Sequence, residues 1–303
     1  MARVGTRTFE QAQRRLSLWF VMPGFLMILI IMGGVAIYSF DLSFRNVELL
    51  RGFSSQYVGL ETYRTVLARR ETIPVIGNTL YWVSVSTILV IALGISVGYL
   101  VSNSRNRVTR VSRAVMLVPW VLPGVVVAGL WKWMYNGQSG LLNKLLMDVG
   151  VLDQGFPFLA RPETVLPSVV IVIVWRLFPI FALVVAAAIQ SIEISLFEAA
   201  RMDGISKTQE FRFIILPSIK YQVLTMGVTV LIWITNNLVL INVMTGGGPL
   251  HFSKTLPVFM YELGFRFGKL SEAAVVTVFN LMILIAFSVV YLLVYRRNQR
   301  GDA

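Results

Sequence analysis

Several polar and aromatic residues inside apolar stretches of this sequence could bind a ligand. Asn236 and Asn237 interrupt the run WITNNL, and Arg176 lies in the run VWRLFP between Trp175 and Phe178. Polar groups in apolar stretches are functional candidates, because burying them without a hydrogen-bonding partner is costly. Amides can donate to and accept from hydroxyl groups, while aromatic rings offer flat apolar faces. The set would suit a ligand rich in hydroxyl groups, and Arg176 could also hold an anion.

Each of these residues also has a structural interpretation. The two asparagines could form hydrogen bonds between helices, and the aromatic rings could simply pack. For Arg176 an anion site and a structural pairing are both open. Because adjacent residues point about 100° apart on a helix, we expect only one of Asn236 and Asn237 to face a ligand.

Catalytic and metal chemistry find little support in the sequence. The chain has no cysteine and one histidine, His251, which excludes thiolate sites and a metal centre built on several histidines. The apolar runs carry no paired acids and no serine–lysine constellation, so an intramembrane enzyme is not supported. No GxxxxGK[ST] loop is present to hold nucleotide phosphates. We therefore predict no catalytic, metal-binding or cofactor-binding residues, and interpret His251 as a surface contact.

One compact charged segment, residues 197–217 (FEAARMDGISKTQEFRFIILP), separates two long apolar runs. Ser195 and Glu198 fit a capping box at the start of a helix, and Ser206 with Gln209 fits a second one. Gly204 between them suits the left-handed conformation that follows a helix end. The segment is therefore predicted to form two short helices that meet at Gly204.

The apolar residues of this segment recur at helical spacing. Phe197 and Ala200 share one helical face, and Phe211 and Ile215 share another. Such faces could lie on a membrane surface or dock into a groove of a partner protein, and the residues alone leave both open. Pro217 disfavours helical geometry at Leu216, so a bend is expected there.

The elements that position these residues are long apolar helices. Of 303 residues 56% are hydrophobic and 14% are charged, against about a quarter charged in soluble domains. Period-two alternation is absent, so helices are the way to satisfy the backbone in lipid. The chain is predicted to be an all-α membrane protein with six spans of roughly 20 residues each. Their expected positions are about 16–40, 76–101, 114–135, 165–189, 221–243 and 273–295.

The basic residues indicate how the chain is oriented. The net charge of +12 does not indicate nucleic-acid binding, because Lys and Arg gather at the ends of apolar runs. The short connection SNSRNRVTRVSR has four arginines and no acid, which favours a cytoplasmic position. The loop 41–75 goes against this rule. We expect both termini and the charged segment to be cytoplasmic, and Lys132 to snorkel at the opposite side. The apolar run from Leu16 is too long for a signal peptide and is interpreted as a retained first helix.

The run EAARMDGISKTQEFRFIILP resembles the EAA loop of importer permeases of the ATP-binding cassette (ABC) class. Three other segments resemble the carbohydrate branch of that family, which includes maltose F-type and glycerol-phosphate A-type subunits. These segments are VGLETY at 58–63, NTL at 78–80 and TGGGP at 245–249. Thr62 stands where an asparagine is usual, and Gly33–Gly34 where many relatives have a proline. The resemblance implies a cytoplasmic segment 1–15 and a type I permease domain 16–303 with a coupling loop at 190–220.

The resemblance also implies partners and roles. A second permease of the G or E type, two ATPase subunits and an extracytoplasmic solute-binding protein would complete an importer in a bacterial or archaeal inner membrane. The binding protein would contact the loops at 41–75, 136–164 and 245–272. Asn237, with Asn236 beside it, would line a sugar site, and substitution of Gly204 would uncouple transport. A basic residue after the tryptophan is common in the family, including members that carry neutral sugars, which favours a structural pairing for Arg176 over an anion site. The residues that would couple to an ATPase are Glu198, Ala199, Ala200, Arg201, Asp203 and Gly204.

Alternatives remain open within and outside the family. Glu198 could anchor the ATPase or cap its own helix, since one carboxylate cannot fully serve both. A permease for glycerol phosphate, amino acids or oligopeptides is the alternative within the family. A self-contained secondary transporter or channel would need an inverted repeat with broken helices, and none is recognisable in the sequence.

Overall fold

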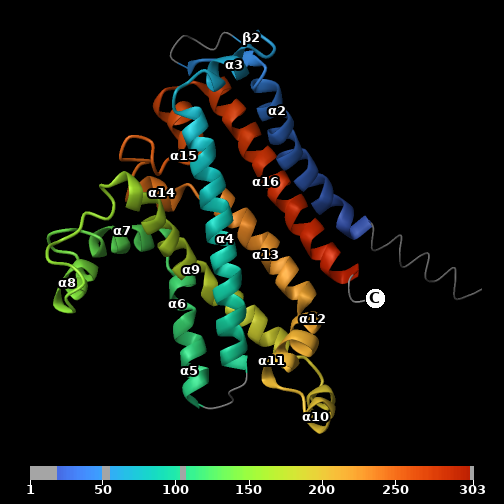
Figure 1. The fold of residues 1–303 in the computed structure, drawn as a ribbon. Coiled ribbons are helices and arrows are strands. Elements are labelled where there is room, and N and C mark those ends of the chain that lie inside the picture. The colour runs from blue at the N-terminus through green and yellow to red at the C-terminus, as the bar shows by residue number, and fades with distance from the viewer. Residues whose placement is uncertain (1–18, 50–54, 103–106, 301–303) are drawn as a thin grey trace, which may run out of the picture.

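The structure is a bundle of long helices with short elements at both ends (Figure 1). The computed structural model describes residues 19–49, 55–102 and 107–300. The predicted segment 1–15 and the first residues of the first predicted span lie outside these ranges. Five described helices are long and apolar enough to cross a membrane, and a sixth span is added if one sharply bent pair is counted as a single span. The prediction of an all-α protein with six spans is confirmed on that count.

Two long helices form the centre of the bundle. Helix α4 (Thr72–Ser102) packs along α9 (Pro162–Gln190), and most of the buried side chains belong to these two helices or to those covering them. The contact is close because α4 presents glycines to its partner. A Cβ atom at Gly94 would lie 2.5 Å from Cδ1 of Phe181, and one at Gly98 would lie 2.7 Å from the carbonyl oxygen of Ala182. Small residues at helix interfaces allow this approach in membrane proteins.

The first and last helices lie together at one side of the bundle. The first helix spans Trp19–Leu42 and contains a π-helical turn at Leu29–Gly33 followed by α2 (Gly34–Leu42). It runs beside α16 (Leu270–Arg300), and its apolar side chains are exposed along its length. Exposed apolar side chains on a helix of this length suit contact with lipid.

Short elements cap the end of the bundle opposite the charged segment. Strands β1 (Arg45–Asn46) and β2 (Gln56–Tyr57) pair antiparallel, and α3 (Glu61–Leu67) follows. Helix α15 (Leu256–Tyr261) and the π-helix η4 (Glu262–Arg266) lie at the same end. Helices α5 (Arg107–Met116), α10 (Ile194–Met202) and α11 (Lys207–Gln209) lie at the other (Figure 1). In this view α16 runs from the α15 end toward the end that carries α12 (Leu216–Ser218).

The third predicted span is not one straight helix. It consists of α5 (Arg107–Met116), α6 (Val118–Val121) and α7 (Gly124–Met134), with a bend of 95° between the last two. Leu122 at the bend is extended, with ψ at 137°, because the residue before a proline avoids helical geometry. Pro123 therefore turns α7 sideways, toward α8 (Leu141–Asp148). The prediction of a continuous helix over 114–135 is wrong.

Candidate functional site

A cavity of about 670 Å³ lies between the α6–α7 bend, α9 and the fifth span. It brings together three of the polar residues singled out in the sequence, because Asn236, Asn237 and Arg176 all line it. Trp120 and Trp233 also line it and add two indole rings. Its wall therefore presents amides, one guanidinium and aromatic faces, set among aliphatic side chains.

The two asparagines share this cavity because the fifth span is interrupted at them. Helix α13 (Lys220–Thr235) ends before Asn236, and α14 (Val239–Met244) begins only after Leu238. The expectation that only one asparagine would face the ligand assumed an unbroken helix, whereas both of them line the cavity. An interrupted span lining a cavity is the form in which non-helical backbone is tolerated at membrane depth.

The amides stabilise the interruption as well as lining the cavity. The Nδ2 of Asn236 donates to the carbonyl of Ile232 at 3.0 Å, and the Oδ1 of Asn237 accepts from the amide of Leu240 at 3.1 Å. The first bond caps the C-terminal end of α13, and the second caps the N-terminal end of α14. Among the described contacts, the Nδ2 of Asn237 has no hydrogen-bond acceptor, so this group can donate to a ligand.

Arg176 supports the α6–α7 bend from across the cavity. Its Nη2 donates to the carbonyl of Leu122 at 3.3 Å, and a Cβ atom at Gly124 would lie 3.2 Å from its Nη1. The partner of Arg176 in the structure is therefore a carbonyl group, and its buried Nε has no hydrogen-bond partner in the described structure. Within the described part of the chain Arg176 forms no ion pair, and it is the only ionisable side chain among the lining residues.

The aromatic neighbours of Arg176 do not line the cavity. Trp175 packs edge to face on Trp131, with ring centroids 5.5 Å apart. Phe178 is half-buried and lies outside the cavity lining. Sequence reasoning missed Trp120 and Trp233 in their place. Pro123 directly after an apolar run was the available signal for Trp120, because a bend there turns the preceding residues toward the interior.

The charged segment forms the predicted pair of helices at the far end of the bundle. Helix α10 (Ile194–Met202) is followed by Gly204 at φ +69°, then by α11 (Lys207–Gln209) and the π-helix η3 (Glu210–Ile215). The amide of Ile205 donates to the carbonyl of Ala200 at 3.2 Å, and that of Gly204 donates to Arg201 at 3.1 Å. These two bonds make a Schellman motif, which needs the left-handed residue that glycine supplies.

One of the two predicted capping boxes is present. Ser206 and Gln209 exchange both bonds of the box, so this prediction is confirmed. The prediction for Ser195 and Glu198 is wrong, because α10 already begins at Ile194 after Glu193 in extended conformation. The Oγ of Ser195 instead contacts the carboxylate of Glu193 at 3.3 Å.

The bend expected at Leu216 is also placed differently. Leu216 is helical, with φ −59° and ψ −43°, and Pro217 lies in the first turn of α12 (Leu216–Ser218). A proline is tolerated there because amides of the first turn have no intrahelical acceptor. The helical geometry is interrupted at Ile219 instead, directly before α13.

The residues proposed for coupling differ in exposure. Glu198, Ala199, Arg201, Asp203 and Gly204 are exposed, and Met202 beside them is 88% exposed. Ala200 is buried and faces the bundle, so it packs inward and does not form part of the exposed surface. Phe197 and Phe211 also pack inward, the latter edge to face on Tyr99. Behind α10 lies a second cavity of about 380 Å³, lined in part by Glu198, Arg201 and Glu210.

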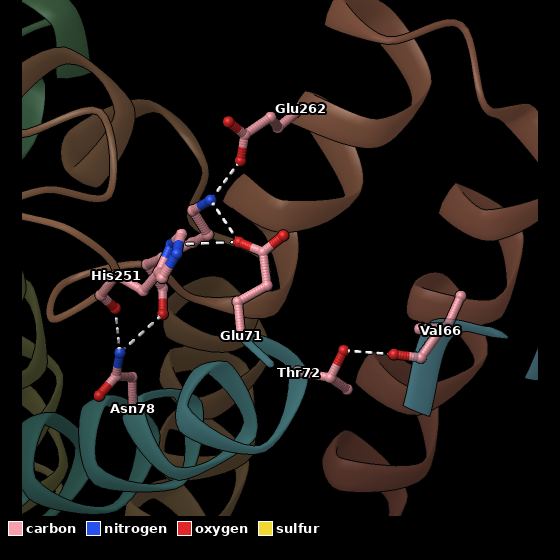
Figure 2. A network of polar contacts seen from close by, with 7 residues as sticks. Val66, Glu71, Thr72, Asn78, His251 and Glu262 are labelled. Atoms are coloured by element: carbon pink, nitrogen blue, oxygen red, sulfur yellow. Dashed lines mark hydrogen bonds and ion pairs between the residues drawn. The ribbon is translucent and has the colours of Figure 1, made fainter. Parts of the chain in front are cut away.

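A charged network joins the start of α4 to the loop after α14 (Figure 2). In Figure 1 the start of α4 lies at the end of the bundle opposite α10. Lys254 is only 4% exposed. Its Nζ donates to Glu71 at 2.9 Å and to Glu262, while Nδ1 of His251 lies 3.1 Å from Glu71. Asn78 donates to the carbonyls of His251 and Lys254 and so fixes the loop backbone. His251 is partly exposed within this network, which agrees with its interpretation as a surface contact.

The glycines of the TGGGP segment allow this network to form. Gly247 has φ +86°, and a Cβ atom there would lie 3.0 Å from Cβ of Lys254. The lysine stem therefore packs directly on the glycine backbone. Lys132, expected to snorkel, donates to the carbonyl of Val243 at 3.3 Å and links α7 to α14.

Comparison with known proteins places the whole chain among transport proteins. A family model described as binding-protein-dependent transport system inner membrane component matches residues 90–301. A probable ABC transporter permease of Brucella suis is 28% identical, over 95% of this chain and 99% of the relative. The trehalose/maltose transport system permease MalF of Thermococcus litoralis is 31% identical, over 79% and 80%. The xylose/arabinose import permease XacH of Haloferax volcanii is 27% identical, over 92% and 87%.

A solved structure has the same fold. A chain of a bacterial ABC transporter involved in the import of the acidic polysaccharide alginate superimposes with a TM-score of 0.80 at 21% identity, over 96% of this chain and 99% of that one. The type I importer permease fold expected from the sequence is therefore confirmed.

Proposed function

This chain belongs to the family of binding-protein-dependent transport system inner membrane components, and we propose that it imports a sugar. As a member of that family it is the membrane-spanning permease of an ABC importer. We propose further that it forms half of the translocation pathway, together with a second permease of the G or E type. The cavity between α7, α9, α13 and α14 would be the part of the pathway that this chain contributes.

The cavity lining is the observation that supports a sugar. Asn236 and Asn237 offer amides, and Trp120 and Trp233 offer rings on which the flat faces of a pyranose can stack. Two relatives named above are permeases for trehalose/maltose and for xylose/arabinose. Asn237 is the proposed ligand residue, because its Nδ2 keeps a donor available.

The exposed face of α10 is the proposed contact with an ATPase subunit. Glu198, Arg201 and Asp203 are exposed at the tip of the bundle beside an exposed methionine, which combines charge with apolar area as docking helices do. Because Ser195 does not cap α10, the proposed role of Glu198 is that of the partner anchor. Two ATPase subunits would hydrolyse ATP, and this chain would be non-catalytic. Both termini would then lie on the cytoplasmic side.

An acidic or phosphorylated cargo is the second candidate, and Arg176 is the observation that favours it. Its guanidinium lines the cavity and forms no ion pair within the described part of the chain. An anionic group could compensate this charge, whereas a neutral sugar would leave only the Leu122 carbonyl to do so. Amino-acid or oligopeptide cargo has no comparable support in the cavity lining.

Reconstitution in proteoliposomes tests the proposal. The chain is combined with its ATPase, its second permease and its binding protein, and uptake of labelled neutral and acidic sugars is measured with and without ATP. We expect ATP-dependent uptake that falls at least tenfold in Asn237→Ala, because the variant loses the hydrogen bond from Nδ2 to a sugar hydroxyl and leaves that hydroxyl unpaired. Uptake by the chain alone, without an ATPase, would refute the importer assignment. Equal uptake by the Asn237→Ala variant would refute the sugar site.

A further inference from the structure

Helix α16 contributes one polar side chain to the interruption in the fifth span. The Nδ2 of Asn280 donates to the Oδ1 of Asn236 at 3.2 Å, although 44 positions separate them in sequence. The Oδ1 of Asn280 is buried and has no hydrogen-bond partner in the described structure. Asn280 does not line the cavity, so its amide acts on the cavity only through Asn236.

The bond from Asn280 gives the Asn236 side chain a second hydrogen-bond partner. The Nδ2 of Asn236 is already bound to the carbonyl of Ile232, which also accepts the Asn236 backbone amide at 3.2 Å. With the Oδ1 bound to Asn280, both ends of the Asn236 amide are fixed. An amide fixed at both ends has one orientation, and so has the backbone turn that carries it.

A second helix holds the interruption from the other side. The Nε1 of Trp82 on α4 donates to the carbonyl of Ile234 at 2.9 Å, in the buried interior. That carbonyl also accepts the amide of Asn237 at 3.1 Å. The end of α13 is thus held between α4 and α16, and Asn280 is the contact on the α16 side.

We propose that Asn280 is a positioning residue that holds Asn236 and the α13–α14 interruption in the shape that forms the cavity. The inference rests on the proposed function, since it takes this cavity as the sugar pathway. Within the described structure, the bond to Asn236 is the one hydrogen bond of the Asn280 side chain, whereas an apolar side chain at position 280 would suit a helix in lipid. Without the bond from Asn280, the interruption would adopt alternative turns, and the Nδ2 donor of Asn237 would lose its fixed direction.

A double-mutant cycle between positions 280 and 236 tests this inference. Asn280→Leu, Asn236→Leu and the double variant are reconstituted with the partner subunits, and ATP-dependent uptake is measured against the concentration of sugar-loaded binding protein. Thr277→Val on α16 is the matched control, because its hydroxyl bonds only to the carbonyl of Ala273 one turn earlier. Asn280→Ala is measured in parallel, and all rates are normalised to the amount of folded permease.

We expect Asn280→Leu to lower the maximal uptake rate about three- to tenfold, the range of one interhelical hydrogen bond in a membrane. The half-saturating concentration of binding protein should not change, because the proposed contacts with the binding protein are the loops at 41–75, 136–164 and 245–272, which do not include position 280. In the Asn236→Leu background the Asn280→Leu change should have no further effect, whereas a merely structural residue would lower the rate again by the same factor. Additive effects, or full activity in both Asn280 variants, would overturn the inference.

The outcome for Asn237 separates this inference from the proposed function. If Asn237→Ala leaves uptake unchanged, the cavity is not the sugar site and the proposed function fails. If Asn237→Ala abolishes uptake while positions 280 and 236 act additively, the sugar site stands and only the positioning role is wrong.

Discussion

Gly204 is the position at which a single methyl group tests the coupling proposal most directly. Its φ is +69°, and a Cβ atom added to it would meet no other atom within 4 Å. Substitution by alanine therefore causes no steric clash with neighbours, and its whole cost is that of the left-handed backbone. That cost is about 1–2 kcal/mol for a residue with a Cβ atom. The expected consequence is loss of the Schellman motif and reorientation of α10 relative to α11.

The size of this penalty sets the expected loss of transport. If docking requires the native turn, about 1–2 kcal/mol lowers the population of the competent conformation roughly 5- to 30-fold. ATP-dependent uptake should fall by a comparable factor in Gly204→Ala, while ATP hydrolysis per sugar rises. Asparagine tolerates the left-handed region better than alanine, so Gly204→Asn should retain more activity.

Gly77→Ala provides the matched control for this series. Gly77 lies inside α4 with ordinary helical geometry and with open space around it, so alanine there should be neutral or slightly stabilising. Uptake should therefore rank wild type, then Gly204→Asn, then Gly204→Ala, with Gly77→Ala at the wild-type level. Unchanged uptake in Gly204→Ala, or a lower rate in Gly204→Asn than in Gly204→Ala, would show that the left-handed turn does not control coupling.

Three further changes test other parts of the structure. Gly94→Val should lower the free energy of unfolding in detergent by about 1–3 kcal/mol, because the valine side chain would overlap Phe181; an unchanged melting temperature would contradict the close packing. Lys254→Met should also destabilise, by about 2 kcal/mol after allowance for the partial exposure of both carboxylates, since it leaves them without their shared cation; a rise in melting temperature would contradict this. Trp82→Phe should reduce maximal uptake several-fold by releasing the carbonyl of Ile234, and wild-type uptake would show that this bond does not hold the interruption.

The parts of the fold that follow from local chemistry were predictable from the sequence. Six apolar runs predicted the spans, because hydropathy over some 20 residues measures the cost of crossing lipid. The turn at Gly204 and the capping box at Ser206 depend on residues within a few positions of each other. The predicted capping box at Ser195 was wrong, because a helix can begin one or two residues earlier than its apparent cap, and α10 begins at Ile194 without a side-chain cap.

The two interruptions that build the cavity were not predicted, although both contain visible signals. Pro123 and the Asn236–Asn237 pair lie in stretches that remain apolar on both sides, so a hydropathy window cannot distinguish a broken span from a continuous one. The break at Asn236 is held by Trp82 from α4 and Asn280 from α16, both far away in sequence. A contact between helices that distant can be found only after the helices have been placed.

The position of α9 suggests how the proposed coupling surface could act on the proposed pathway. Arg176 supports the bend beside the cavity, and the same helix continues past Pro179 to Gln190, close to the charged segment. The distance between these points is roughly 21 Å at 1.5 Å per residue. Along this length α9 packs on the glycines of α4 with no space for an added Cβ atom, so the pair should move as one body. A displacement of α10 would then reach the cavity through this closely packed helix pair, and the two interruptions around the cavity would be where the backbone absorbs it.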